Sequence, residues 1–246
     1  MSTTAVQARV RWGAERKFFT VLAMAAFVVA YVGFSRTFFL RPLFPDYPAP
    51  HEPIFLVHGT LFAAWCVLLV VQASLVGFAR SDIHRKLGVC GAVLAAGMVV
   101  FGFAGALVAA HRPSGFVGIA VPPLQFMIVP FFDIVLFATF VTIGISRRTD
   151  PQTHKRWMML ATCNLLAAAF ARWPIVGDSK NPLIFFGLTD LFVVALAAWD
   201  LRSRGRLHAA TLRGGLALIL SQPLRLALSG TSTWLAFAAW ATKLVG

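Results

Sequence analysis

Residues 54–79 read IFLVHGTLFAAWCVLLVVQASLVGFA, which is 26 consecutive residues without an Asp, Glu, Lys or Arg. A helix of that length rises by roughly 39 Å at about 1.5 Å per residue, and the hydrocarbon core of a bilayer is about 30 Å thick. Backbone groups in lipid must pair internally, so a crossing segment is either a helix or a strand of a closed barrel. The stretch lacks the alternation of apolar and polar residues that barrel strands show. It therefore predicts a membrane-spanning helix.

Similar apolar runs occur along the whole chain of 246 residues, of which 59% are hydrophobic and 13% are charged. A soluble domain would carry about twice that charge. The sequence predicts an all-α fold: one transmembrane domain over residues 1–246, a polytopic helical bundle of six to seven spans, with seven preferred. The expected spans are residues 18–36, 54–79, 86–110, 122–146, 155–173, 182–200 and 212–229. Residues 233–244 are too few to cross and are expected to form a short interfacial or re-entrant helix on the outer face.

Positive charge alternates between heavy and light from one loop to the next. Four segments hold fifteen basic residues, namely Arg9, Arg11, Arg16, Lys17, Arg80, Arg85, Lys86, Arg147, Arg148, Lys155, Arg156, Arg202, Arg204, Arg206 and Arg213. The intervening segments hold five: Arg36, Arg41, Arg112, Arg172 and Lys180. Cytoplasmic loops of membrane proteins are enriched in Lys and Arg. The pattern predicts a multi-pass protein of a bacterial inner membrane with its N-terminus in the cytoplasm.

The net charge of +13 would suggest nucleic acid as the partner of a soluble protein. Here the charge follows from the loop asymmetry, so we expect the bilayer and the anionic lipids of its cytoplasmic face as partners, and no nucleic acid. The first span reads as an uncleaved signal anchor, because it is long and ends without a small-x-small cleavage site. Cys66, Cys90 and Cys163 all fall within predicted spans, so no disulfide framework is expected.

Two further segments each have two interpretations. Residues 37–53 contain five prolines and several aromatic residues, and form either a lid over the helix ends or an interfacial loop anchored by its aromatic residues. Residues 81–86 and 150–156 resemble each other, as a weak internal repeat or simply as two cytoplasmic helix starts. In both, an acid, Asp82 or Asp150, is predicted to be the N-cap.

Ionisable residues inside spans are costly in lipid, and each is a candidate functional residue. From the direction of each span, all such residues fall in the outer half of the membrane: His58, Asp133, Arg172, Asp190 and Arg225. One hypothesis is structural: Asp133 pairs with Arg225 and Asp190 pairs with Arg172. The other is a polar cavity facing outward, in which the two acids carry a proton or cation, the two arginines clamp an anion and His58 is a titratable gate.

Span 2 carries a polar stripe, because His58, Trp65 and Gln72 are seven residues apart and seven residues bring a helix back to nearly the same face. The stripe would line the ligand site or make hydrogen bonds to neighbouring helices. In span 4, Pro130 precedes Asp133 by three residues and is expected to bend the helix. Kinked helices often line sites in membrane proteins.

No cofactor and no metal site is expected. A b-type haem needs two axial ligands from facing helices, and the candidates form two pairs, His84 with His154 at the cytoplasmic boundary and His58 with His111 near the outer one. Three of these four lie at helix ends, where we expect interfacial roles. The sequence contains no His-Glu-x-x-His, Gly-rich nucleotide loop or Gly-x-Ser-x-Gly motif.

Six short motifs together resemble a group of bacterial inner-membrane proteins of unknown function. They are Phe39-Leu40-Arg41-Pro42-Leu43, Val57-His58-Gly59 with Trp65 and Gln72, His84-Arg85-Lys86-Leu87-Gly88, Thr153-His154-Lys155-Arg156-Trp157-Met158, Ala171-Arg172-Trp173-Pro174 and Ser221-Gln222-Pro223-Leu224-Arg225. The resemblance covers most of the chain. It implies a bundle of six to seven helices and implies no activity.

The sequence therefore favours an integral membrane protein that handles a small ligand or a proton in a polar cavity facing outward, a transport function. Two alternatives remain: a haem-dependent electron-transfer protein, which is the enzyme-class reading, and a non-catalytic assembly or structural protein whose polar groups only stabilise helix contacts.

Overall fold

The structure, a computed structural model, describes residues 3–173, 176 and 181–246, and this part of the chain contains helices and no strands. Pro174 of the fifth quoted motif and Lys180 lie outside the described residues. The long helices are α1 (Thr3–Phe34), α2 (Pro53–Gly77), α3 (Ser81–His111), α5 (Ile128–Ser146), α6 (Pro151–Asn164), α9 (Pro182–Arg204) and α10 (Ala209–Leu228). Shorter helices are α4 (Pro123–Phe126), α7 (Leu166–Phe170) and α11 (Ser232–Thr242). The predicted all-α fold is confirmed.

Five segments of the described chain are long and apolar enough to cross a membrane: Gly13–Phe39, Pro53–Gly77, Ser81–His111, Pro123–Ser146 and Pro182–Arg204. The other two expected spans do not reach that standard. The helix expected over 155–173 is divided at Leu165 into α6 and α7, and α10 carries Arg213, Gln222 and Arg225. The sequence-based count of seven spans is therefore not confirmed, whereas a multi-pass membrane protein fits the five.

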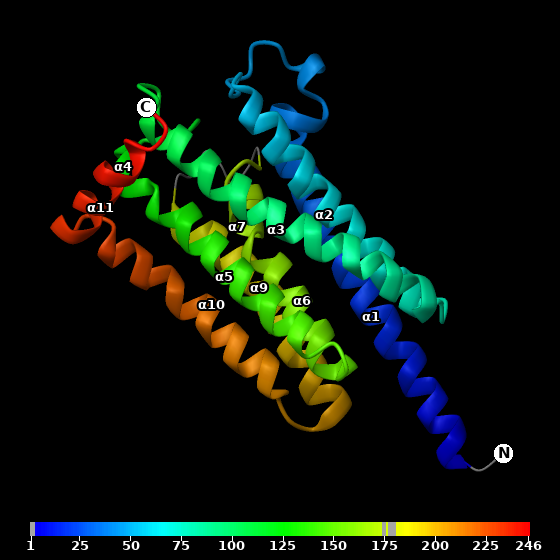
Figure 1. Cartoon of the computed structure of the whole chain (residues 1–246). Helices are drawn as coiled ribbons and strands as arrows, with labels where there is room; N and C mark the ends of the chain where they lie inside the picture. Colours follow the sequence, from blue (N-terminus) through cyan, green and yellow to red (C-terminus); the bar gives the residue numbers. More distant parts are fainter. Residues whose placement is uncertain (1–2, 174–175, 177–180) are drawn as a thin grey trace.

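The long helices run side by side in one bundle (Figure 1), and their contacts describe a ring around one central helix, α6. Neighbours in the ring are α1 and α2, α2 and α3, α3 and α5, α5 and α10, and α10 and α9. The ring closes where Phe18 of α1 stacks on Trp199 of α9 with ring centroids 4.5 Å apart. Inside it, α6 contacts α1, α5, α9 and α10, and α7 contacts α1 and α9. A helix surrounded by protein need not be apolar on its surface, which explains why α6 and α7 look unlike the other spans.

Glycines let other helices approach this centre. A Cβ at Gly33 of α1 would meet the backbone of Ala169 in α7, and a Cβ at Gly214 of α10 would lie 2.6 Å from Leu160 of α6. Small residues at helix contacts are the usual route to close packing in membranes. The buried core is accordingly densest on α6 and α7, where Leu160, Ala161, Cys163 and Leu166 are almost completely buried.

The two predicted N-caps, Asp150 and Asp82, can be compared with the structure. The Asp150 side chain accepts hydrogen bonds from the backbone N–H groups of Gln152 and Thr153, so this residue is the N-cap of α6 as predicted. The hydroxyl of Thr153, 2.5 Å away, holds the pKa of Asp150 below its usual value. The corresponding prediction for Asp82 is wrong. Asp82 lies in the first turn of α3 and pairs with exposed Arg80, which is the capping residue.

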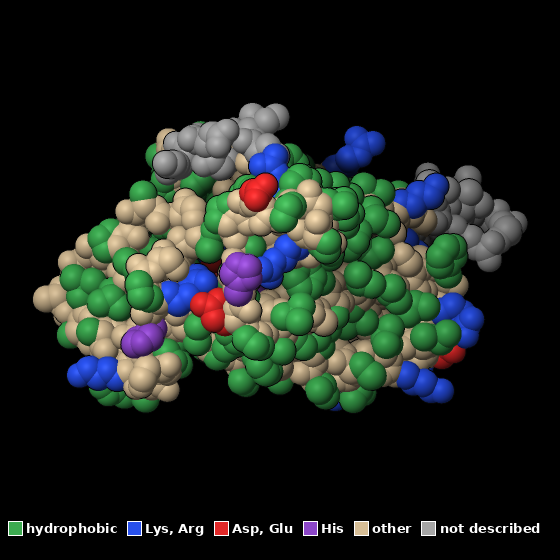
Figure 2. Space-filling view, turned by 90° about the horizontal axis from the view of Figure 1, so that it is seen from above, with side chains coloured by type: hydrophobic (Ala, Val, Ile, Leu, Met, Phe, Trp, Pro, Cys, Tyr) green, Lys and Arg blue, Asp and Glu red, His purple; other side chains and the backbone are tan. Residues whose placement is uncertain are grey.

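Residues 35–52 fold back on the ends of α1 and α2 instead of running as an extended chain. They contain a π-helical turn, Ser35–Phe39, and a 3₁₀ turn, Arg41–Leu43. Arg112, which follows the last residue of α3, holds this segment in place, because its guanidinium lies 3.3 Å from the carboxylate of Glu52. Figure 2 shows this end of the molecule, where basic, acidic and histidine side chains lie among hydrophobic ones. We call it the loop end.

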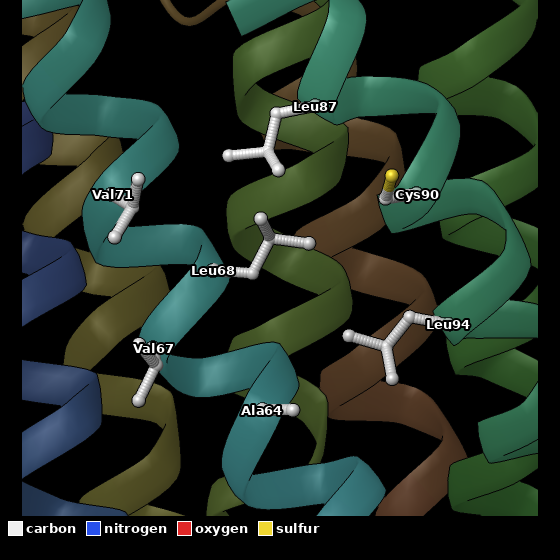
Figure 3. Close-up of a pocket in the computed structure, with 7 residues that line it drawn as sticks. All are labelled: Ala64, Val67, Leu68, Val71, Leu87, Cys90 and Leu94. Atoms are coloured by element: carbon white, nitrogen blue, oxygen red, sulfur yellow. The ribbon is translucent and has the colours of Figure 1, made fainter.

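Away from the loop end, an open groove of about 480 Å³ runs between α2 and α3 (Figure 3). Its seven lining residues are apolar or weakly polar: Ala64, Val67, Leu68, Val71, Leu87, Cys90 and Leu94. Such a surface suits lipid chains. All three cysteines are free, in agreement with the expectation of no disulfide.

The basic residues gather at the opposite end, which we call the basic end. The α2–α3, α5–α6 and α9–α10 turns all lie there, with the start of α1 (Figure 1). The side chains of Arg9 and Arg11 lie outside the described part. If the charge asymmetry sets the orientation, the loop end faces outward.

We expect a single cysteine at Asp46, in a background with Cys66, Cys90 and Cys163 changed to Ser, to react with a membrane-impermeant maleimide in intact bacterial cells. A single cysteine at Arg148, in the α5–α6 turn, should react only after the cells are permeabilised. Mass tagging on a gel measures both. The reverse pattern would contradict the orientation and the assignment of every residue to an inner or outer half.

Candidate functional site

The predicted pairing of Asp133 with Arg225 is present in the structure. The Arg225 guanidinium on α10 donates to the Asp133 carboxylate on α5 at 2.5 Å, and both side chains are buried. Arg225 also donates to the Ser221 hydroxyl at 2.8 Å and lies over the rings of Phe132 and Phe186. The pair thus joins two ring helices and is shielded from lipid by aromatic side chains.

The central helix joins this pair through Asn164, the last residue of α6. Its side-chain amide donates to the backbone carbonyl of Asp133 at 2.7 Å. The other amide atom, Oδ1, is buried without a hydrogen-bond partner in the described part of the chain. Buried polar atoms in proteins are nearly always satisfied, so this acceptor is available to a water molecule or a ligand donor.

Asp190 does not pair with Arg172, and that prediction is wrong. On α9, Asp190 accepts a hydrogen bond of 2.8 Å from the side-chain amide of Gln222 on α10. Arg172 instead donates to the backbone carbonyl of Ala168 at 2.6 Å and lies over the ring of Phe34. Among the described residues, no Lys or Arg lies within ion-pair distance of Asp190. The two acids therefore have different partners, a cation for Asp133 and a neutral amide for Asp190.

The polar side chains described above lie on α5, α6, α9 and α10, and three of these four helices are irregular near them. The helix expected over 122–146 is interrupted at Met127, and Pro130 follows. The central helix is interrupted at Leu165, next to Asn164, and α10 contains Pro223 between Gln222 and Arg225. A proline leaves the carbonyl four residues before it without its helical donor. Irregular helices at membrane depth line binding sites in many transporters.

We call Asp133, Asn164, Asp190, Ser221, Gln222 and Arg225 the polar network. It lies in the half of the bundle nearer the loop end: Asp133 is the sixth residue of α5 and Asp190 the ninth of α9, both counted from that end, and Arg225 is close to the end of α10. Asp133, Asp190 and Arg225 thus lie in the same half of the bundle.

The remaining predicted residues lie elsewhere. His58 of α2 has its Nδ1 3.3 Å from the carbonyl oxygen of Phe101 and stacks on Phe62. Trp65 donates to the Thr162 hydroxyl of the central helix at 3.0 Å. Gln72 donates to the backbone carbonyl of His84 at 3.2 Å. The stripe on α2 thus makes helix contacts, which is the second of the two interpretations.

The structure brings together one of the two predicted histidine pairs and separates the other. His84 of α3 and His154 of α6 lie together at the basic end, with ring centroids 6.2 Å apart. His58 and His111 are not brought together, because His58 contacts Phe101, ten residues or about 15 Å along α3 from His111. His111 instead packs near the C-terminal Gly246. Within the described residues, no group of three or more His, Cys, Asp or Glu is arranged to hold a metal.

Sequence reasoning missed a second buried ion pair, between Arg156 of α6 and Asp200 of α9. Both side chains have no exposed surface, and Arg156 also donates to the side chain and carbonyl of Gln152. Asp200 also accepts from the backbone N–H of His208 at 3.1 Å. Beside this pair, Lys155 contacts Glu15 of α1 at 2.6 Å. These contacts join α1, α6 and α9 at the basic end.

The missed residues had weak signals. Asp200 is an acid at the end of an apolar run, and Ser221 and Gln222 belong to the Ser-Gln-Pro-Leu-Arg motif. Asn164 carried no signal beyond being a polar residue inside a predicted span.

Comparisons of the chain with protein-family models, with curated proteins and with solved structures found no match.

Proposed function

We propose that the protein is a multi-pass transport protein that binds and releases a proton, or a small polar ligand, at the polar network, with access from the loop end. The observation that carries the proposal is the contrast between its two acids. Asp133 has a cation as its partner, and Asp190 has only the amide of Gln222 among the described residues.

The contrast assigns different roles to the acids. The carboxylate of Asp133 is held by Arg225 and ties α5 to α10, so Asp133 is the structural member of the network. A carboxylate inside an apolar helix without a positive partner is costly while it is charged. Asp190 is therefore the group that gains or loses a proton, and Gln222, which can donate to the carboxylate or accept from the protonated acid, suits both states.

The irregular helices support a binding role. The prolines at 130 and 223 remove the helical donors of the Phe126 and Ile219 carbonyls. Such carbonyls, with Asn164 Oδ1, would contact a small polar ligand. Arg225 would be the clamp for an anionic group, if a ligand displaced Asp133.

The proposal includes seven crossings. The α6–α7 pair and α10 run beside α5 and α9 in the bundle, as Figure 1 shows, and Arg156, Gln222 and Arg225 face protein, whereas Arg213 is exposed. With the five apolar helices they would place the N-terminus in the cytoplasm of a bacterial cell and α11 at the outer face. There Trp234 of α11 donates to the carbonyl of Leu124 in α4 at 2.8 Å.

Changing Asp190 to Asn should abolish proton movement through the protein. In liposomes that contain the purified protein and a trapped pH-sensitive dye, the wild type should dissipate an imposed pH gradient faster than empty liposomes. Asp190→Asn should lower the protein-dependent rate at least tenfold, because the amide cannot exchange a proton. Asp46→Asn, a change of the same type at an exposed position of the loop end, should keep the wild-type rate.

Equal rates for the wild type and Asp190→Asn would exclude a proton-carrying role for this acid. If in addition neither protein exceeded empty liposomes, the non-catalytic structural alternative would be favoured. The electron-transfer alternative would use His84 and His154 instead. These lie at the basic end, whereas Asp190 lies in the half of the bundle nearer the loop end.

A further inference from the structure

At the basic end, two histidines that are seventy residues apart in the chain lie face to edge. His84 is the fourth residue of α3 and His154 is the fourth residue of α6, and their ring planes are 88° apart. Both side chains are partly buried. They take no part in the polar network, so the argument that follows is independent of the proposed function.

The ring of His154 is held in one orientation. Its Nδ1 lies 2.8 Å from the backbone carbonyl of Gly144 on α5, which requires Nδ1 to carry the proton and donate it. Gly144 makes the contact possible, because a Cβ there would lie 2.8 Å from the sulfur of Met158. The lone pair of His154 is then on Nε2. Metal-binding histidines typically have this arrangement, in which the second nitrogen donates to a carbonyl or carboxylate.

His84 and Gln72 each have a buried side-chain atom without a hydrogen-bond partner in the described part of the chain. These atoms are Nδ1 of His84 and Oε1 of Gln72. Gln72 is held close by, because its amide nitrogen donates to the backbone carbonyl of His84 at 3.2 Å. Buried atoms without partners are uncommon in native proteins and call for an explanation such as a missing water or ion.

The separation of the rings matches that of two ligands on one metal ion. Metal–imidazole bonds are about 2.0–2.1 Å, and the ring centre lies about 1.1 Å behind the bonded nitrogen, so ligands on opposite sides of an ion place their centroids roughly 6 Å apart. The observed distance is 6.2 Å. Tetrahedral neighbours would be closer, at about 5 Å by the same geometry. We propose that His84 and His154 bind one transition-metal ion between them from opposite sides.

Two sources provide a metal that accepts two opposed imidazoles and no further protein ligand. One is the iron of a b-type haem, whose macrocycle supplies the other four nitrogens. Exposed Arg85, Lys86 and Arg148 near this end would pair with its carboxylates. The other is a free soft ion such as Cu⁺, for which imidazole is a suitable ligand. From the sequence alone, the two histidines form a candidate haem pair, but interfacial roles and no cofactor are expected.

The test is to measure bound metal and the visible spectrum of the full-length protein, purified in detergent from cells grown with added iron and copper. We expect close to one metal ion per chain in the wild type. His84→Ala and His154→Ala should each lower the metal content at least tenfold. His51→Ala, at an exposed histidine of the loop end, should leave it unchanged. Size-exclusion profiles show which variants remain folded.

Iron together with a Soret band identifies haem, whereas copper without that band identifies the free ion, and either result supports the site. If the alanine variants do not fold, haemin and Cu⁺ are titrated into metal-free wild-type protein and into Gln72→Leu, which removes the amide beside His84. Weaker binding in that variant supports the site. Wild-type protein that holds no metal and binds neither haemin nor Cu⁺, or metal that persists in both histidine variants, would overturn the proposal.

Discussion

Arg225→Ala should lower the free energy of unfolding by roughly 3–5 kcal/mol, because it leaves the buried carboxylate of Asp133 without its cation. The side chain of Asp133 has little contact with solvent, and Arg225 is its only charged partner in the described part of the chain. The loss would appear as a reduced yield of folded protein and as unfolding at a lower concentration of denaturant in mild detergent.

The double variant distinguishes pairing from a general packing effect. Asp133→Asn on the Arg225→Ala background removes the uncompensated charge, so it should restore part of the lost stability. Leu224→Ala, at an exposed position of the same helix, is the control, because it shortens a side chain without leaving Asp133 unpaired. Losses that simply add in the double variant would mean that the two residues are not energetic partners.

Asp200→Ala should be similarly damaging, at roughly 3–5 kcal/mol, because it leaves Arg156 buried without a carboxylate. The change also deprives the N–H of His208 of its acceptor at the start of α10. Chemical denaturation in detergent measures the loss.

The matched control is Asp82→Ala, which removes the carboxylate from an ion pair with Arg80 whose side chains are 56% and 60% exposed. Pairs in that environment contribute about 0–1 kcal/mol. Equal losses for Asp82→Ala and Asp200→Ala would contradict the central role given to the buried pair at the basic end.

The helices of the ring were predictable because a segment that crosses lipid must be helical, apolar and about 20 residues long. The run 54–79 became α2, Pro53–Gly77, and the run 86–110 lies within α3, Ser81–His111. Depth was predictable as well, since counting residues from the end of a span gives a height in the bundle. That is why Asp133 and Arg225 were matched correctly.

Position around the ring was not predictable from the same pattern. The sequence placed Asp190 and Arg172 in the same half of the membrane, yet Asp190 faces α10 and Arg172 lies against Phe34 of α1. A continuous apolar run indicates no face, so the sequence did not show that Gln222 is the partner. The pairing of His84 with His154 was predicted from their shared position at the cytoplasmic boundary, and the structure brings the two rings together.

The central helix was misjudged for a different reason. Arg156 was counted among the basic residues of a cytoplasmic segment, whereas α6 begins at Pro151 and carries Arg156 into the protein. Likewise α9 continues beyond residue 200 to Arg204, which places Asp200 inside the bundle. Hydropathy shows where an apolar run ends. A helix that is shielded from lipid by other helices can continue past that point with polar residues, so its ends are not visible in the hydropathy.

The central claim, that Asp190 is the acid that gains and loses a proton, is tested most directly by infrared spectroscopy of the protein in lipid while the pH is changed. A protonated carboxyl shielded from water has a carbonyl stretch distinct from that of solvated carboxyls. The account predicts such a band in the wild type and in the doubly neutral Asp133→Asn, Arg225→Gln variant, and its loss in Asp190→Asn. A band that persists in Asp190→Asn, or that disappears with Asp133, would contradict the account.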